Sequence, residues 1–252
     1  MSVIEADVVA EGERLLRLAE ETGVTLRLLG GVAICLQAPG RLPPALLRPY
    51  KDLDFVTTRR SAQDAARLLR GEGYEPHVAF NALHGSERLL FFDNEHDRQI
   101  DVFVGGFRMS HRIPLDERVE LEPISVPLAE LLLTKLQIAE LNEKDVRDTV
   151  ALLHGHDVGE IDGETVNAAR VAQLCAVDWG LWRTISGNLS TCREHVNRYD
   201  LPAEERARVA GRLDKLLERI EREPKSRAWK LRARIGERKR WYELPEEVAG
   251  GP

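Results

Sequence analysis

The 252-residue sequence lacks the features that mark membrane and secreted proteins. No uninterrupted apolar run approaches the roughly 18 residues that a membrane span needs. The first residues, with Glu5 and Asp7, lack the basic start of a signal peptide. The three cysteines, Cys35, Cys175 and Cys192, are widely spaced and form no CxxC pair, which is typical of reduced thiols rather than disulfides or zinc ligands. We therefore expect a cytoplasmic protein with no membrane partner.

What the chain does contain is ordinary for a globular protein: 43% hydrophobic and 31% charged residues. There is no internal repeat and no low-complexity tract. The net charge of −6 hides an asymmetry, because residues 1–160 carry a net −9 and residues 161–252 a net +3. The acidic first part fits a cation site. Residues 225–242 hold eight basic residues against Glu237 alone, which fits either a nucleic-acid backbone contact or a solvated helix face.

Apolar periodicity and turn residues predict alternating helices and strands up to Gly105-Gly106. The expected strands are Val24–Leu29, Leu53–Thr57, Tyr74–Phe80, Arg88–Phe92 and Gln99–Val104. The expected helices here are 4–22, Val32–Ala38 and one that Ser61 caps and that ends at Gly71 or Gly73. A strand, a helix and then a run of strands predicts a mixed sheet with helices on one side, in an α/β or α+β core.

After an extended stretch near Leu121–Val126, the pattern becomes helical. The expected helices are 128–141, Lys144–His154, Glu164–Ala176, Trp179–Tyr199, Ala203–Glu223 and Arg227–Trp241. The helix over 203–223 has the apolar face of an antiparallel bundle. We therefore expect two domains, a core over residues 1–115 and a helical part over 116–252.

Three aspartates are the main candidate site residues. Asp52 and Asp54 are two positions apart at the strand Leu53–Thr57, so their side chains project from the same face. Two carboxylates held that close repel each other unless a cation lies between them. Asp101 interrupts the apolar strand Gln99–Val104, where burying an unpaired carboxylate is costly. If the two strands are neighbours, the three carboxylates form an oxygen cluster suited to Mg²⁺.

Gly30-Gly31 follows the first expected strand and precedes a short helix. Glycine allows close backbone approach, and the N–H groups of a helix N-terminus bind phosphate. The proline-rich spacer to Asp52 contains Arg48 and Lys51, two cations suited to phosphate. A lone Gly-Gly is usually a turn, and a lone DxD is often a turn or a solvated strand edge. Their order along the chain, completed by Asp101, indicates metal-assisted phosphoryl or nucleotidyl transfer.

Over residues 24–105, these motifs resemble the core of the DNA polymerase β-like nucleotidyltransferase superfamily, in Gly30-Gly31, Asp52-x-Asp54 and Asp101. Farther on, Lys135 and Lys144-Asp145-x-x-Asp148 are similar to the AbiEii-type toxin branch, where a helix pair with the pattern K…(R/K)D..D follows the core. The aminoglycoside and lincosamide nucleotidyltransferases share the same core. The resemblance implies an α/β nucleotidyltransferase core with a mixed sheet, followed by an all-helical C-terminal part.

The resemblance also implies roles for individual residues. Asp52 and Asp54 bind metal, with two Mg²⁺ ions expected, and Asp101 is the third ligand or the base. Gly30-Gly31 hold the triphosphate of an NTP such as ATP, and Lys135 and Asp148 lie on the substrate side. The family often has Gly-Ser where this chain has Gly30-Gly31, so one phosphate-binding hydroxyl is missing.

The predicted function is Mg²⁺-dependent transfer of a nucleoside monophosphate from an NTP to an acceptor hydroxyl. The toxin-like branch implies a tRNA 3′ end or a protein as the acceptor, and a cognate antitoxin as a partner. One alternative is transfer to a small molecule such as an antibiotic. Another is a non-catalytic nucleotide-binding or partner-binding protein with the same fold.

Several residues have a structural interpretation beside the functional one. Lys135 either serves the site or extends from its leucine-rich helix to solvent. Asp145 and Asp148 fit a substrate site or a charged helix start. His84 and His111 either meet near the site or stabilise loops. Trp229 and Trp241 either stack on bases or pack the last helix, whereas Trp179 and Trp182 are expected in the core.

Overall fold

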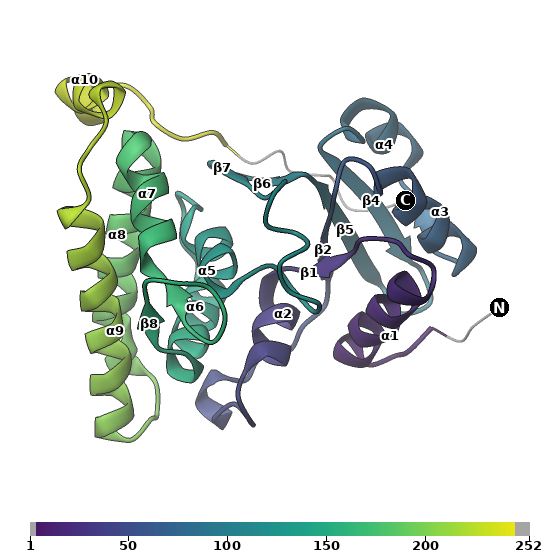
Figure 1. Ribbon diagram of the computed structural model, residues 1–252. Helices are drawn as coiled ribbons and strands as arrows, with labels where there is room; N and C mark the ends of the chain where they lie inside the picture. The colour runs from purple at the N-terminus through teal and green to yellow at the C-terminus, as the bar shows by residue number, and fades with distance from the viewer. Residues whose placement is uncertain (1–3, 245–252) are drawn as a thin grey trace.

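A computed structural model describes residues 4–244, and its centre is a five-stranded mixed sheet (Figure 1). The strand order is β1-β2-β5-β4-β3. The strands are β1 (Arg27–Leu28), β2 (Leu53–Thr57), β3 (Glu75–Pro76), β4 (Arg88–Asp93) and β5 (Arg98–Val104). β2 and β5 are parallel and the other neighbours are antiparallel. The predicted mixed α/β fold is therefore confirmed.

The helices of the first half surround this sheet. They are α1 (Val8–Glu21), α2 (Gly30–Gln37), the 3-10 turn η1 (Pro44–Leu46), α3 (Ala62–Gly71) and α4 (Val78–His84). In Figure 1, α1 and α3 lie on one side of the sheet, and the helices of the second half lie on the other. Leu53, Phe55 and Val56 of β2 are fully buried, so both faces of this strand are covered, and Asp54 is the one residue of β2 that is only partly buried.

The second half is mainly helical. It contains α5 (Leu128–Leu136), α6 (Glu143–Gly155), α7 (Ala168–Val177), α8 (Trp179–His195), η2 (Val196–Arg198), α9 (Ala203–Arg222), α10 (Arg227–Ile235) and η3 (Gly236–Arg238). Two small sheets accompany these helices, β6 (Gly106–Arg108) with β7 (Arg112–Pro114), and β8 (Val158–Gly159) with β9 (Val166–Asn167). α7, α8 and α9 contact one another, and α9 buries Val209, Leu213, Leu216 and Ile220. The predicted bundle face of α9 is thus confirmed.

The predicted strand Tyr74–Phe80 is wrong, because only Glu75–Pro76 pair with β4 and the chain then turns into α4. His77 caps this helix through a hydrogen bond from Phe80 N–H to its Nδ1. The Asn81 side chain accepts from Leu90 N–H and donates to Leu90 C=O, at 2.7 and 3.0 Å. These bonds occupy the edge of β4 where a longer β3 would have paired, so a helix is accommodated there.

Other element boundaries also differ from the predictions. α5 ends at Leu136 instead of continuing to 141, and Asn188 donates to the carbonyls of Leu136 and Ile138 just beyond it. α10 ends at Ile235 rather than Trp241, because Gly236 has a φ of 59° that no helix continues. Ser61 stands at the start of α3 without making a side-chain cap.

The two halves of the chain share contacts, since α2 packs against α5 and α6, and Leu28 N–H donates to Ile124 C=O. The division near residue 115 stays a prediction. The three cysteines are free. Among residues 4–244, no helix is both long and apolar enough to cross a membrane.

Candidate active site

Asp54 and Asp101 lie directly opposite each other on the adjacent parallel strands β2 and β5. Asp101 is 4% exposed and Asp54 is half-buried. The strands that carry two of the three predicted aspartates are therefore neighbours, as the prediction required. Asp52 precedes β2 by one residue and stays exposed. The charges of Asp52 and Asp101 both act on Asp54, so the three carboxylates influence one another although they span 49 positions of the chain.

Gly30 begins α2 directly against Asp54. Its φ is +67°, and a Cβ placed on it would overlap Oδ2 of Asp54. Leu29 N–H donates to Asp54 C=O at 2.8 Å, which fastens the start of α2 to β2. Leu29, at the N-cap position, supplies no side-chain hydrogen bond to the helix. The first N–H groups of α2 therefore begin beside a carboxylate, and a side chain at position 30 would separate them.

Asp101 has two side-chain partners that the sequence did not reveal. Arg88 Nε donates to its Oδ1 at 2.7 Å, and Gln99 Nε2 donates to its Oδ2 at 2.7 Å. Arg88 is on β4, where the antiparallel register places it opposite Phe103, two residues beyond Asp101. Residues two apart share a face, so the guanidinium reaches the carboxylate diagonally. An arginine at the start of an apolar strand was the available sequence signal, but its partner depends on strand order.

A buried ion cluster joins the second half of the chain to this site. Asp148 of α6 accepts from Nε and Nη2 of Arg48, at 2.7 Å each, and lies 2.8 Å from Lys135 Nζ. Lys135 also lies 3.4 Å from Oδ1 of Asp145. The Lys135 side chain is only 12% exposed, so it does not extend to solvent from α5. The charged start of α6 is therefore part of the site's surroundings rather than a solvated helix end.

Arg48 is held against Gly31, where a Cβ would overlap its Nη2, and it lies over the Tyr50 ring at 4.6 Å. The second glycine of the pair therefore makes room for a guanidinium. Arg48 and the exposed Lys51 line one surface hollow together with Arg98. Their predicted contacts with phosphate stay predictions.

The carboxylates have unequal proton affinities. The pKa of Asp54 is raised to about 6, first by burial and then by the charges of Asp101 and Asp52, while the charge of Lys135 opposes the rise. The pKa of Asp52 is raised by the protein atoms crowded around it and then by Asp101, although its side chain is exposed. Burial alone would lower the pKa of Lys135, but Asp148 and Asp145 together hold it above its ordinary value. Lys135 is therefore a buried ammonium, and its charge favours the ionised form of Asp54.

The donor chemistry of Asp52 and Asp54 fits a divalent cation, because two crowded carboxylates with raised pKa values gain from a shared positive charge. Within residues 4–244, however, no three His, Cys, Asp or Glu side chains converge closely enough to hold a metal. The two oxygens of the Asp101 carboxylate accept hydrogen bonds from Arg88 and Gln99 instead.

The structure shows what His111 and the four tryptophans contact. His111 is buried, 2.8 Å from Thr184 Oγ1, and its backbone N–H donates to the Gln137 side chain. It therefore joins the β6–β7 hairpin to α8.

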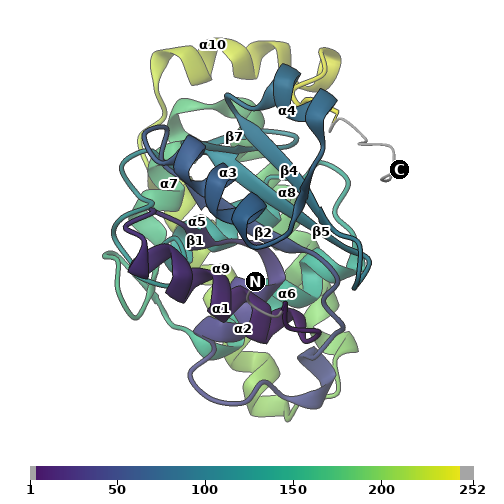
Figure 2. The same cartoon turned by 90° about the vertical axis from the view of Figure 1, so that its right-hand side faces the viewer.

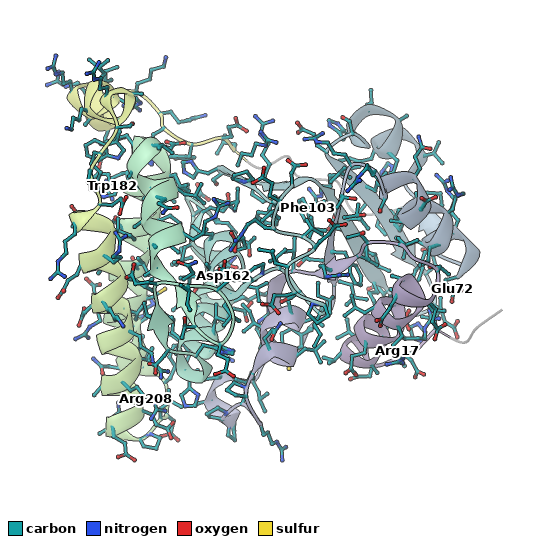
Figure 3. The ribbon with its side chains drawn as sticks, in the orientation of Figure 1. Arg17, Glu72, Phe103, Asp162, Trp182 and Arg208 are labelled. Carbon is teal, nitrogen blue, oxygen red and sulfur yellow. The ribbon has the colours of Figure 1, made fainter. Side chains whose placement is uncertain are left out.

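The four tryptophans form contacting ring pairs between α8, α10 and the segment after η3: Trp179 with Trp182 and Trp241, and Trp182 with Trp229. Trp182 lies at the helical side of the molecule, away from Phe103 of β5 (Figure 3).

Comparison with known proteins gave remote likenesses only. No family model matches the chain, and none of the curated proteins does. Among solved structures, the chain is similar to the lincosamide antibiotic adenylyltransferase LnuA with lincomycin bound, at 18% identity and a TM-score of 0.39, over 56% of this chain and 92% of that one. It is also similar to an antigenic nucleotidyltransferase-like protein from Paracoccidioides brasiliensis, at 12% identity and a TM-score of 0.43, over 90% of this chain and 97% of that one. Both likenesses are remote, so the function proposed below rests on the chain's own residues.

Proposed function

We propose that this protein is a Mg²⁺-dependent nucleotidyltransferase, which moves a nucleoside monophosphate from an NTP to an acceptor hydroxyl and releases pyrophosphate. One observation carries the proposal: the start of α2 lies against Asp54, directly beside Asp101. Helix N–H groups suited to phosphate and carboxylates suited to a cation are thus in one place. That combination is what nucleotidyl transfer requires.

Each residue of the site has a proposed role. Asp52 and Asp54 would hold Mg²⁺, which supplies charge stabilisation for the phosphates. The N–H groups at Gly30 and Gly31 bind the triphosphate, next to Arg48. Asp101 accepts the proton of the acceptor hydroxyl. Lys135 stays charged beside Asp54 because two carboxylates of α6 hold its pKa high, so it adds a fixed positive charge near the reacting phosphate.

This proposal keeps the sequence-based resemblance to the polymerase β-like superfamily and to its AbiEii-type branch. That branch implies RNA or a protein as acceptor, with a cognate antitoxin. Support for RNA comes from α10 and the residues after it, where six basic residues are exposed: Arg227, Lys230, Arg234, Arg238, Lys239 and Arg240. Arg232 is not among them, because it lies over Trp179 and donates to the carbonyls of Gly236 and Lys239.

The non-catalytic alternative is disfavoured by Asp54. A half-buried carboxylate whose pKa is raised to about 6 costs folding free energy at neutral pH, and a protein without catalysis gains nothing from it.

A transfer assay tests the proposal. Wild-type protein is incubated with each of four α-labelled NTPs and Mg²⁺, together with total RNA, protein and small hydroxyl compounds. Asp54→Asn is run in parallel, with Asp200→Asn as a control at an exposed carboxylate. We expect labelled product or labelled NMP from wild type and Asp200→Asn, and a loss of orders of magnitude in Asp54→Asn. Equal turnover in all three, or none in any, would contradict the proposal.

A further inference from the structure

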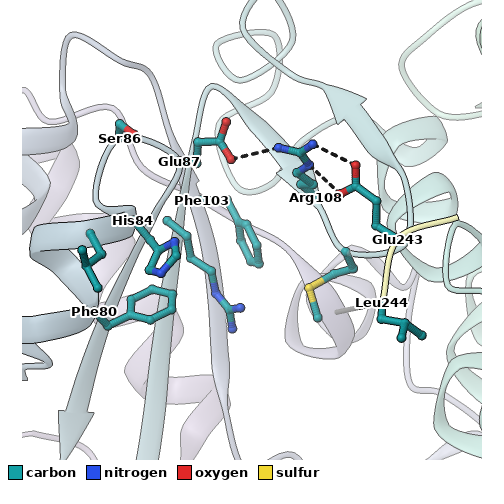
Figure 4. Close-up of a pocket in the computed structure, with 11 residues that line it drawn as sticks. Phe80, His84, Ser86, Glu87, Phe103, Arg108, Glu243 and Leu244 are labelled. Atoms are coloured by element: carbon teal, nitrogen blue, oxygen red, sulfur yellow. Dashed lines mark hydrogen bonds and ion pairs between the residues drawn. The ribbon is translucent and has the colours of Figure 1, made fainter. Parts of the chain in front are cut away.

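A cavity of about 400 Å³ opens between α4, the sheet and the segment that carries Arg108 and Glu243 (Figure 4). Its lining includes Arg88, which donates to Asp101. We name it the ring pocket. It is lined by Phe80, Leu83 and His84 of α4, by Arg88 and Phe103 of the sheet, and by Met109, Arg108, Glu243 and Leu244, among others. The rings of Phe80 and His84 are 4.8 Å apart. The volume and the aromatic lining are those of a small-molecule site.

The position of the ring pocket relative to the aspartates indicates which substrate it could hold. In the sheet order β1-β2-β5-β4-β3, α2 begins beside β2, Asp101 is on β5, and Arg88 is on β4. The ring pocket and the start of α2 therefore lie on opposite sides of Asp101. In nucleotidyl transfer the attacking and leaving oxygens are roughly in line across the phosphorus. If pyrophosphate leaves toward Gly30, the attacking hydroxyl comes from the direction of the ring pocket.

The charges of the ring pocket cancel. Arg108 binds Glu243 at 2.9 Å and Glu87 at 3.4 Å, and Arg88 is paired with Asp101. Both arginines of the lining therefore already have carboxylate partners, which leaves the ring pocket without an excess of positive charge for a phosphate. The exposed Leu83 and the half-buried Met109 add apolar surface. The ring pocket thus favours a compound with an apolar or aromatic ring and without negative charge.

Arg88 lies between Asp101 and the ring pocket. Its guanidinium lies 5.7 Å from the Phe80 ring centre and 5.2 Å from that of Phe103, while its Nε holds Asp101. A ring that enters between Phe80 and Phe103 needs the space that this guanidinium occupies.

From these observations we infer that the ring pocket binds the acceptor, an uncharged or cationic ring compound with a hydroxyl group, and that Arg88 is a positioning residue which releases Asp101 when the acceptor binds. The inference rests on the proposed nucleotidyl transfer. In the step, the hydroxyl oxygen bonds to the α-phosphorus and its proton passes to Asp101. The bond to the oxygen that bridges to the β-phosphorus breaks, and pyrophosphate leaves.

The test uses 4-nitrophenyl β-D-glucoside, an uncharged aromatic ring with hydroxyls, and its anionic counterpart 4-nitrophenyl phosphate. Binding to the full chain is measured by equilibrium dialysis without nucleotide. Leu83→Glu places a charge on the ring pocket's wall. Val78→Glu is the matched control, since it lies on the same helix outside the lining, and both positions are exposed, at 78% and 73%. Neither change disturbs a buried contact.

We expect the glucoside to bind saturably to wild type and to Val78→Glu. It should bind at least about tenfold more weakly to Leu83→Glu, and the phosphate compound should bind wild type at least about tenfold more weakly than the glucoside does. The glucoside should also accelerate pyrophosphate release from ATP in wild type and Val78→Glu. No saturation up to about 10 mM, equal binding to Leu83→Glu, preference for the phosphate, or binding without acceleration would each overturn the inference. Label that moves to RNA would overturn the inference in favour of the RNA acceptor that the exposed basic residues of α10 suit. Absence of turnover with all four NTPs, to water included, would instead count against the proposed function.

Discussion

Asp148 accepts two hydrogen bonds from Arg48, at 2.7 Å each, although the two residues are 100 positions apart. The same carboxylate lies 2.8 Å from Lys135 Nζ. One side chain of α6 therefore fixes a guanidinium beside Gly31 and an ammonium near Asp54. A carboxylate of the second half of the chain therefore holds two cations close to the strand that carries Asp54.

The first prediction concerns this carboxylate. Asp148→Asn removes the charge that two buried cations share, and should lower the free energy of unfolding by about 3 kcal/mol. It should also raise KM for the NTP, because Arg48 is no longer held. The matched variant is Asp145→Asn, three residues earlier on α6. Asp145 is 3.4 Å from Lys135, and within residues 4–244 its Oδ2 has no hydrogen-bond partner, so a loss of no more than about 1 kcal/mol is expected. Denaturant titration of both variants measures the difference, and equal losses would contradict the prediction.

Lys135 should set the acid limb of the activity profile. The pKa of Asp54 is about 6 with the opposing charge of Lys135 in place, so Lys135→Met should move that pKa upward. Activity needs the ionised carboxylate. The acid limb of kcat/KM against pH should therefore shift to higher pH in Lys135→Met. Lys230→Met, on the exposed face of α10, should leave the profile in place. An unchanged or lower apparent pKa in Lys135→Met would refute this role.

Gly30 should tolerate no side chain. Its φ of +67° costs an L-residue about 1–2 kcal/mol, and a Cβ would also overlap Asp54 Oδ2. Gly30→Ala should therefore lose both stability and turnover. Gly71, near the end of α3, is the control, because nothing lies within 4 Å of its added Cβ. Gly71→Ala should be neutral or slightly stabilising. Thermal unfolding and NTP turnover of both variants decide the matter, and a fully active Gly30→Ala would exclude the proposed phosphate contact.

Asp54→Asn should be more stable than wild type in the absence of metal. The folded pKa of about 6 lies above the ordinary value of 3.8, so between these values the folded protein keeps a proton that the unfolded chain releases. Stability therefore falls as pH rises from about 4 to 6, and the full cost remains above pH 6. The variant lacks this cost and should gain about 3 kcal/mol at neutral pH, with no gain near pH 4. Asp200→Asn should show no such pH-dependent gain in urea titrations. A gain independent of pH would mean that Asp54 is not the group responsible.

Arg88 should govern whether Asp101 meets a metal. Arg88→Met leaves a carboxylate that is 4% exposed without its cation, at a cost of about 3 kcal/mol. Mg²⁺ at the three aspartates would then replace the lost charge. The rise in melting temperature on adding Mg²⁺ should therefore be larger in Arg88→Met than in wild type. Arg108→Met, which loses only exposed ion pairs, should respond as wild type does. Identical Mg²⁺ responses in all three proteins would argue against Asp101 as a ligand.

The difference between prediction and structure is clearest at Tyr74–Phe80 and at Asp101. Alternating residues in the first segment predict a strand, but the bonds of Asn81 to Leu90 decide for a helix, and they depend on β4. An aspartate in an apolar strand indicates a buried site. That Arg88 and Gln99 hold its two oxygens follows only from the register between β4 and β5 and from the side-chain arrangement there.

The sequence by itself determined the features that depend on neighbouring residues: the apolar strand that carries Asp54, the close backbone approach at Gly30 and the apolar face of α9. These follow from backbone periods of two and 3.6 residues and from the conformational freedom of glycine. Only the tertiary structure decided which strand lies beside β2, which cations meet Asp148, and that Arg88 stands between Asp101 and the ring pocket. Such pairings join residues far apart in the chain, so their partners are set by how the sheet and helices assemble rather than by any local pattern.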